Sequence, residues 1–333
     1  MNSSEFDIIK KYFTFLDQRR DVILPAGDDC AIVDASQHHP ASCSAIAVTT
    51  DTLVSGIHFP LQTCAADIAY KALMVNLSDL AAMGAEPAWL CLSLTLPEIK
   101  HPWLSEFSTQ LKQTLAENKI SLIGGDTTRG PLSITMQAMG LLNKAKAMRR
   151  NQARPGDRIF VTGTLGDAAI GLRCVTENLD DPALADCVHK LNRPQARNRF
   201  ALALVDYCDC AIDISDGLLA DLGHLLEASH CGAILQQAAI PISTAAAYYC
   251  DHYCQHQTDW SMVLSHGDDY ELCFTVAADK VAAVEKLADT LSLPVSCIGE
   301  ITEEKSLLCV DKHNKPVNYT MLGYQHFNQH VSK

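Results

Sequence analysis

The 333-residue sequence lacks several features that mark large classes of protein. It has no apolar run close to the roughly 20 residues that a membrane-spanning helix needs. The stretch Met1 to Lys11 carries acidic residues and no apolar core, so it does not resemble a signal peptide. Basic residues are outnumbered, and a net charge of −13 without a basic stripe argues against nucleic-acid binding. We therefore expect a cytoplasmic protein that binds neither membranes nor nucleic acid.

The 14 cysteines lack the arrangement of a zinc site or a disulfide framework. No Cys-x-x-Cys pair occurs. The two closest pairs, Cys208 with Cys210 and Cys250 with Cys254, have no second half at zinc-binding spacing. Many of the others lie within apolar runs, so buried free thiols in a reducing compartment are the interpretation that we favour.

Three nucleotide-binding signatures are also absent. The sequence contains neither the glycine-rich P-loop with its lysine nor the Gly-x-Gly-x-x-Gly fingerprint of dinucleotide-binding folds. The protein-kinase set of glycine loop, strand lysine and catalytic-loop aspartate is missing as well. If a nucleotide binds, its phosphates must be held mainly through metal ions, assisted by glycine backbone and an arginine.

The chain is long enough for two domains and has the composition of an ordinary globular protein, with 48% hydrophobic and 20% charged residues. Short runs of branched residues alternate with amphipathic runs, which predicts an α/β fold. The predicted strands cover residues 43–49, 89–96, 120–123, 132–142, 158–162, 210–214 and 272–276, and the predicted helices cover 65–83, 102–118 and 218–228. A polar segment with Pro-Gly over 150–157 places the boundary between domains 1–150 and 151–333.

Nine aspartates stand in short segments beside small or hydroxyl residues, at points where apolar runs end. These segments are Gly27–Asp29, Thr49–Asp51, Asn76–Asp79, Gly124–Gly130, Asp213–Gly217 and Gly267–Tyr270. Carboxylates that are brought together repel one another unless a cation joins them. Hard oxygen ligands suit Mg²⁺, which proteins usually hold with a few carboxylates plus substrate phosphates. The pattern predicts metal-dependent phosphoryl chemistry.

Some of these residues also have a purely structural interpretation. The glycine pair before Asp126 fits a tight turn, but the acid, hydroxyls and arginine that follow favour phosphate binding. Ser215 or Asp216 would cap the helix predicted after them, although a helix start also attracts phosphate. Asp79 lies inside an apolar helical pattern, where an unpaired carboxylate costs several kcal/mol, so it is the better candidate for a ligand.

Three further side chains have two interpretations each. His58 would by itself more often be a structural histidine. Arg150 forms a basic pair with Arg149 that is either solvated or able to reach a nucleotide phosphate. Phe327 either anchors the C-terminal segment or stacks on a flat ligand.

Taken in order, these segments resemble the thiamine-monophosphate kinase family, from Glu5-Phe6 nearly to the end of the chain. Its most specific parts are Thr49–Val54, Tyr70–Leu73, Asn76–Gly84, Leu122–Pro131, Val161–Asp167, Asp213–Leu218, Gly267–Leu272 and Gly323–Phe327. The resemblance implies a two-domain aminoimidazole ribonucleotide synthetase-like fold with mixed α/β sheets. The N-terminal domain would bind ATP and magnesium and pair in a homodimer, and the C-terminal domain would be α/β.

The resemblance also implies an activity and a set of site residues. The activity is transfer of the ATP γ-phosphoryl group to thiamine phosphate, directly and in line, with several Mg²⁺ ions and no catalytic side chain. The implied magnesium ligands are Asp29, Thr49, Thr50, Asp51, Asp79, Asp126, Asp213 and Asp216; the nucleotide contacts are Gly125, Asp126, Arg150 and Ser215; the substrate contacts are His58, Asp268 and Phe327. The family usually has Gly-Gly-Glu-Asp-Tyr where this chain has His266-Gly267-Asp268-Asp269-Tyr270, so a shorter carboxylate faces the substrate here.

Two alternatives remain open at this point. Another ATP-using synthetase of the same fold would activate a carbonyl or selenide acceptor. Selenophosphate synthesis would require a reactive cysteine and a lysine in a glycine-rich N-terminal segment, and residues 1–29 contain no such pair. The other alternative is a non-catalytic nucleotide and metal sensor, which would make no ADP.

Overall fold

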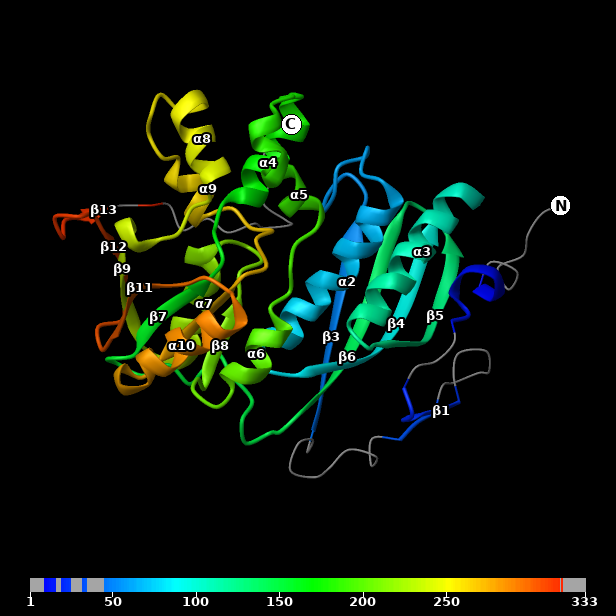
Figure 1. Cartoon of the computed structure of the whole chain (residues 1–333), viewed down its shortest axis with the longest axis horizontal. Helices are drawn as coiled ribbons and strands as arrows, with labels where there is room; N and C mark the ends of the chain where they lie inside the picture. The colour runs from blue at the N-terminus through cyan, green and yellow to red at the C-terminus, as the bar shows by residue number, and fades with distance from the viewer. Residues whose placement is uncertain (1–8, 16–18, 25–31, 35–44, 318, 320–333) are drawn as a thin grey trace. The chain divides into compact units, whose positions relative to one another are not determined.

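The computed structural model describes residues 9–15, 19–24, 32–34, 45–317 and 319. The chain forms two compact units, unit 1 (Met1–Ala147) and unit 2 (Met148–Lys333), which Figure 1 shows. In the described ranges, no helix is both long and apolar enough to cross a membrane. The cysteines of those ranges are free thiols and most of them are buried, as the sequence predicted.

Unit 1 is built on a four-stranded sheet in the order β3-β6-β4-β5. Its strands are β3 (Ala45–Val54), β4 (Glu86–Leu96), β5 (Ser121–Arg129) and β6 (Ser133–Leu142). β6 is antiparallel to both β3 and β4, whereas β4 and β5 are parallel. A parallel pair needs a long crossover connection, and a helix supplies it here.

Two helices, α2 (Ala65–Ala82) and α3 (His101–Glu117), lie side by side on the sheet of unit 1 (Figure 1). In α3 the buried residues Leu104, Phe107, Leu111 and Leu115 recur at helical spacing, so one face packs and the other is solvated. α2 is buried on nearly all sides. The shorter elements of unit 1 are η1 (Ile9–Phe13) and the antiparallel pair β1 (Val22–Leu24) and β2 (Ile32–Val33).

Two acidic segments that the sequence placed at strand ends lie inside strands instead. Thr49–Asp51 is in the middle of β3, and most of Gly124–Gly130 belongs to β5. Threonine is a good strand former, because its branched side chain packs well on a pleated surface, and the alternation of β3 continues unbroken to Val54. The predicted strand ends at 49 and 123 were therefore too early.

Unit 2 contains a seven-stranded mixed sheet in the order β13-β12-β9-β11-β7-β10-β8. Only β12 and β9 are parallel among its described pairs. The strands are β7 (Arg158–Thr162), β8 (Cys210–Asp213), β9 (Gly232–Gln236), β10 (Leu272–Val276), β11 (Val295–Thr302), β12 (Leu307–Val310) and β13 (Pro316–Val317). The mixed sheets of both units confirm the predicted α/β class.

The helices of unit 2 connect these strands. They are α4 (Asp167–Glu177), α5 (Ala185–Asn192), α6 (Asn198–Leu204), α7 (Leu218–Ser229), α8 (Thr244–Tyr253), α9 (Trp260–Leu264) and α10 (Val281–Leu291), with short 3-10 turns η3 (Pro182–Leu184), η4 (Gln237–Ala239) and η5 (Ala278–Lys280). The predicted helix over 218–228 is α7, one residue longer.

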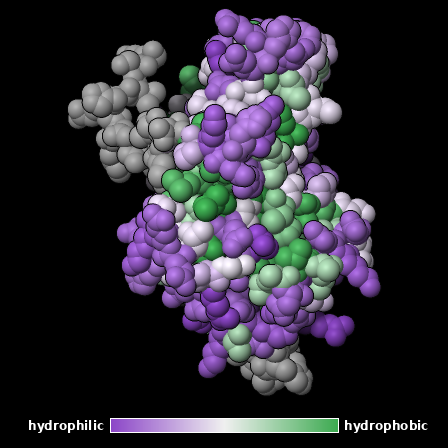
Figure 2. Space-filling view, turned by 90° about the vertical axis from the view of Figure 1, so that its left-hand side faces the viewer, coloured by the Kyte–Doolittle hydropathy of each residue, from purple (hydrophilic) through white to green (hydrophobic). Residues whose placement is uncertain are grey.

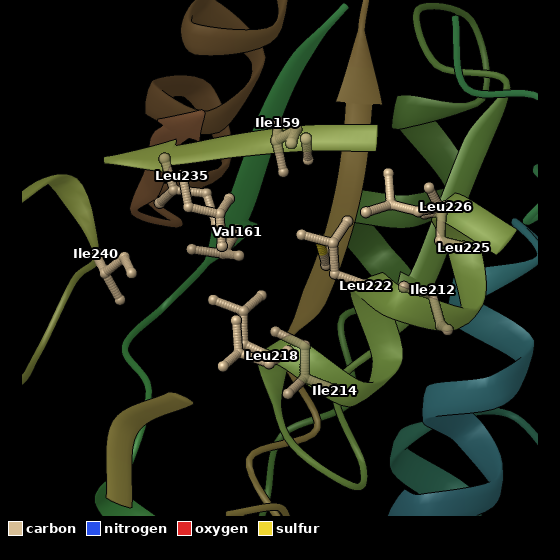
Figure 3. Packing of buried hydrophobic residues seen from close by; sticks show 14 of the residues in the cluster. Ile159, Val161, Ile212, Ile214, Leu218, Leu222, Leu225, Leu226, Leu235 and Ile240 are labelled. Atoms are coloured by element: carbon tan, nitrogen blue, oxygen red, sulfur yellow. The ribbon is translucent and has the colours of Figure 1, made fainter. Parts of the chain in front are cut away.

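The main core of unit 2 lies between α7 and one face of the sheet. Figure 3 shows Leu218, Leu222 and Leu225 of α7 turned toward Ile159 and Val161 of β7. On the opposite face of the sheet, the rings of Phe160 and Phe274 stack at 5.6 Å and Phe200 of α6 packs on Phe274 at 5.8 Å. This packing fixes the ends of β8 and α7, between which a candidate loop runs.

The surface of this part of the molecule is mostly hydrophilic, with small hydrophobic patches between the polar residues (Figure 2). Ile234 and Leu308, which are paired on β9 and β12, are 37% and 38% exposed. A pair of partly exposed apolar residues of this kind is normal on globular proteins.

Candidate functional site

A carboxylate pair lies between β3 and α2 in unit 1. Thr49 and Asp51 alternate with Thr50 on β3 and share the side of the strand on which Leu53 is buried. The Thr49 hydroxyl donates a short hydrogen bond to Asp79 of α2. Burial, followed by the charge of Asp79 and a hydrogen bond to it, raises the pKa of Asp51 to about 6. Thr49 and Asp51 therefore meet an acid that lies about 30 residues further along the chain.

Asp79 is the accessible residue of an otherwise buried stretch of α2. From Lys71 to Leu80 every residue is buried except Asp79, which remains partly accessible. One turn earlier, the Oδ1 atom of Asn76 is buried and accepts no hydrogen bond from the described residues, although its amide donates to the Ala72 carbonyl at 3.0 Å. A buried acceptor without a donor is unusual in a native fold.

Thr50 and Asp126 are not brought to this pair. The side chain of Thr50 lies on the other side of β3, where it accepts a hydrogen bond from Gln137 at 3.3 Å. Asp126 is on β5, the opposite edge strand, beside Ser93 and exposed. Two strands separate β3 from β5. At a spacing of about 4.8 Å per strand, the backbones of Asp51 and Asp126 therefore lie roughly 14 Å apart.

Gly125 has a structural reason to be glycine. Its φ is +153°, and a Cβ built on it would lie 1.8 Å from the backbone oxygen of Leu92 on β4. At Gly124 a Cβ would make only an ordinary contact, 3.6 Å from the sulfur of Cys91. Close approach of two strands thus explains the second glycine without any ligand.

His58 is held in a tight turn that directly follows β3. The backbone N–H of Val54 donates to Nδ1 of His58 at 2.9 Å, so Nδ1 carries no proton and the neutral ring presents its N–H at Nε2. Lys71 of α2 is 2% exposed, and its Nζ donates to the His58 carbonyl at 3.2 Å. Lys71 belongs to the Tyr70–Leu73 motif, to which the sequence assigned no role.

Two loops of unit 2 interlock at the carboxyl end of β8. Asp213, the last residue of β8, is 3% exposed, and Ser215 and Asp216 follow it. The second loop precedes β10 and carries Asp268. The backbone N–H of Asp268 donates to the Ser215 carbonyl at 2.9 Å, and the Tyr270 N–H donates to the Ile214 carbonyl at 2.8 Å. The structure therefore brings Asp268 to the Asp213–Gly217 loop.

The helix after this loop is not capped as predicted. Neither Ser215 nor Asp216 caps α7; the N-cap is Gly217, which has no side chain for the task. Instead, the side chain of Asp221, in the first turn of α7, accepts hydrogen bonds from the backbone N–H groups of residues 215–217. Burial raises the pKa of Asp221 to about 6, and the charge of Asp216 adds to the shift. An acid at this position resembles an ordinary helix-surface residue in the sequence, so the pattern did not reveal it.

Two other acids tie the Asp268 loop to the rest of unit 2. Asp269 accepts the backbone N–H of Gly166 at 2.9 Å and so caps the start of α4. Burial raises its pKa well above the usual range, and the charges of Asp167 and Glu271 add to this. Glu271 is 4% exposed and forms an ion pair with Arg197, whose Nε donates to Oε2 at 2.6 Å.

The remaining predicted residues are separate from these clusters or outside the described ranges. Arg150 lies in a turn with an exposed side chain, and its carbonyl accepts a hydrogen bond from the Ser229 hydroxyl at 2.7 Å. It belongs to unit 2, which begins at Met148. Asp29 and Phe327 lie outside the residues that the structure describes.

The donor set around Asp51 and Asp79 fits a magnesium ion. It consists of oxygen atoms only, and Mg²⁺ is usually held by one or two carboxylates plus substrate phosphates. Within the described ranges no group of three or more His, Cys, Asp or Glu side chains is placed to hold a metal. Two carboxylates are a number of protein ligands that suits magnesium where phosphate oxygens supply the others.

Comparisons with known proteins identify the family of the chain. Residues 27–142 match the family model of the AIR synthase related protein N-terminal domain, and residues 154–311 match that of the C-terminal domain. The chain is 44% identical to thiamine-monophosphate kinase of Escherichia coli (strain K12), over 98% of this chain and 99% of that protein.

Solved structures give the same result. The crystal structure of thiamine-monophosphate kinase from Stenotrophomonas maltophilia K279a superposes with a TM-score of 0.81 at 41% identity, covering 88% of this chain and 92% of that one. A structure described as AaThiL complexed with AMPPCP and TMP has a TM-score of 0.76 at 28% identity, covering 85% and 87%. These matches confirm the resemblance in the sequence: the chain belongs to the thiamine-monophosphate kinase family and has the two-domain AIR synthase fold.

Proposed function

We propose that this protein transfers the γ-phosphoryl group of ATP to thiamine phosphate, giving thiamine diphosphate and ADP. The observation that carries the proposal is the meeting of Thr49, Asp51 and Asp79 at one place, in a chain similar from end to end to thiamine-monophosphate kinases. A neighbour in the same family is described as a complex with AMPPCP and TMP, which supports a nucleotide and a phosphorylated co-substrate.

In unit 1, we assign Thr49, Asp51 and Asp79 to one magnesium ion, together with the backbone of Thr50. Asp29, which lies outside the described residues, stays a predicted magnesium ligand. The side chain of Thr50 faces away from the pair, so its carbonyl oxygen is the part suited to bind. Asp126 lies at the other edge of the sheet, and we therefore assign it to a different ion. We assign His58 to the substrate.

In unit 2, we assign Asp213 and Asp216 to metal binding and Ser215 to the nucleotide. Gly125 of unit 1 and the exposed guanidinium of Arg150 contribute to nucleotide binding, the latter because its planar fork suits phosphate. Asp268 and Phe327 contact thiamine phosphate. Asp268 is shorter than the family glutamate by one methylene and reaches less far from the backbone. Its contact with the substrate therefore depends more closely on the position of its loop.

The chemistry requires little of the side chains beyond placement. A terminal oxygen of thiamine phosphate attacks the γ-phosphorus of ATP, one O–P bond forms, and the bond to the bridging oxygen breaks to release ADP. The attacking oxygen is already anionic near neutral pH, so the protein supplies no general base. Bound magnesium ions, several in this proposal, supply the positive charge that offsets the repulsion between two polyanions. The carboxylates and hydroxyls orient the reactants in line.

We also propose that the protein is a homodimer that pairs through the sheet of unit 1. On β3 the side opposite Thr49 and Asp51 carries Ile46 and Val48, which are 44% and 58% exposed. A second copy packed on this side of the sheet would cover both side chains. Val48→Lys would then shift the molar mass in solution toward the monomer. The free thiols of the described residues suit a reducing compartment, so we place the reaction in the cytoplasm.

The test is to incubate the purified chain with ATP, Mg²⁺ and thiamine phosphate. We expect thiamine diphosphate and ADP in equal amounts, and no ADP when thiamine phosphate is omitted. Asp79→Asn should lose most of the turnover, whereas Glu98→Gln, a change of an exposed surface acid, should not. ATP binding without ADP formation would show a nucleotide sensor and contradict the proposal.

A further inference from the structure

Three backbone N–H groups point at a single side-chain oxygen at the start of α7. The Oδ2 atom of Asp221 accepts hydrogen bonds from Ser215 at 3.0 Å, Asp216 at 2.9 Å and Gly217 at 3.1 Å. Asp221 itself is 4% exposed. Successive N–H groups around one oxygen form the arrangement with which protein backbones bind phosphate. Here the chain's own carboxylate takes the place of the anion.

These three N–H groups are therefore not offered to a nucleotide. The interpretation of this helix start as a phosphate site, which the sequence allowed, does not hold for them, because a carboxylate already occupies the position. What the arrangement does is hold the backbone of residues 215–217 in one conformation. The side chains of Ser215 and Asp216, which stay partly accessible, project from this held backbone.

The second loop rests on the first. A Cβ on Gly267 would lie 1.9 Å from the Ser215 carbonyl oxygen, so the two backbones are in direct contact. The Asp268 N–H donates to that same carbonyl. Asp268 and Tyr270 have φ of +72° and +51°, in the left-handed region that residues other than glycine seldom adopt. Such a backbone persists only where its surroundings hold it.

We propose that Asp221 is a positioning residue that orders both the Asp213–Gly217 loop and the Asp268 loop for phosphoryl transfer. It touches neither reactant, and it acts by occupying the N–H groups of residues 215–217. This inference rests on the proposed function for its kinetic consequence, but its structural part can be tested separately.

The experiment compares Asp221→Ala and Asp221→Asn with Glu227→Ala, which changes an exposed acid on the same helix. Amide hydrogen exchange over residues 214–218 should speed up at least tenfold in Asp221→Ala. The increase should be smaller in Asp221→Asn, whose side-chain oxygen still accepts hydrogen bonds, and absent in Glu227→Ala. Amide exchange over residues 266–271 should increase in the same order among the three variants.

The kinetic measurement separates positioning from a merely structural role. At temperatures where the variants are folded by circular dichroism, Asp221→Ala should lower kcat/KM for thiamine phosphate at least a hundredfold. Asp221→Asn should recover much of this loss, and Glu227→Ala should match the wild type. Binding of AMPPCP with Mg²⁺, measured by calorimetry, should weaken in the same order.

Two results would overturn the inference. One is unchanged exchange over 214–218 in Asp221→Asn and in any folded Asp221→Ala protein. The other is faster exchange with kcat/KM and AMPPCP binding within twofold of the wild type. A wild-type protein that makes no thiamine diphosphate would instead refute the proposed function, and the exchange and AMPPCP measurements would still decide the role of Asp221.

Discussion

Replacing Asp51 by asparagine should stabilise the metal-free protein while removing its activity. Burial and Asp79 raise the pKa of Asp51 from 3.8 to about 6. Each unit corresponds to about 1.4 kcal/mol, so the ionised carboxylate destabilises the folded state by at most about 3 kcal/mol. Asp51 is partly accessible to solvent, which screens the charge, and we expect about 1–2 kcal/mol.

The direction of the pH dependence follows from the sign of the shift. Between about pH 4 and pH 6 the folded state keeps a proton that the unfolded state has released. The free energy of unfolding contributed by this group is therefore highest below pH 4, falls as the pH rises through 6, and stays low above it. Asp51→Asn lacks this fall, because the amide does not ionise.

The assay is urea unfolding in EDTA at pH 5 and pH 8, followed by tryptophan fluorescence. Trp89 and Trp103 report on unit 1 and Trp260 reports on unit 2. The gain of Asp51→Asn over the wild type should be larger at pH 8 than at pH 5. Magnesium with AMPPCP should stabilise the wild type more than the variant. A variant that is less stable than the wild type at pH 8 in EDTA would refute the reasoning, because Asp51 would then be a structural acid.

Two further predictions concern the elements that support the site. Gly125→Ala should destabilise unit 1 by about 3 kcal/mol or more, because its Cβ would overlap the Leu92 carbonyl and force β4 and β5 apart. Gly124→Ala is the matched control and should shift the unfolding midpoint little. Equal effects of the two substitutions would contradict the close approach of the two strands at Gly125. Arg197→Met should cost about 3–5 kcal/mol, since it leaves the buried Glu271 carboxylate without its partner. The double variant with Glu271→Gln should recover part of this loss in thermal unfolding, and additive losses would show that the pair is not coupled.

The elements of the fold could be predicted wherever burial follows a local period. The leucines of α7 and the spaced apolar residues of α3 identify helices with a packed face, and both helices are found within one residue of the predicted bounds. The strand ends were harder to predict. In β3 the apolar run of the sequence gives way to the polar residues Thr49–Asp51, whereas the alternation of burial continues to Val54. The contact of Thr49 with Asp79 of α2 joins segments too far apart in sequence for a local pattern to show it.

The composition of the candidate site was readable from the sequence, because clustered aspartates beside small and hydroxyl residues are costly without a cation. Which of them meet was decided only by tertiary structure. The packing of α2 against β3 puts Asp51 beside Asp79, and the order of strands leaves Asp126 at the far edge of the same sheet. Residues that support a site through the backbone, such as Asp221 and Lys71, stayed hidden for the same reason: their partners are N–H and C=O groups, which every residue carries, so only the folded geometry shows which ones they hold.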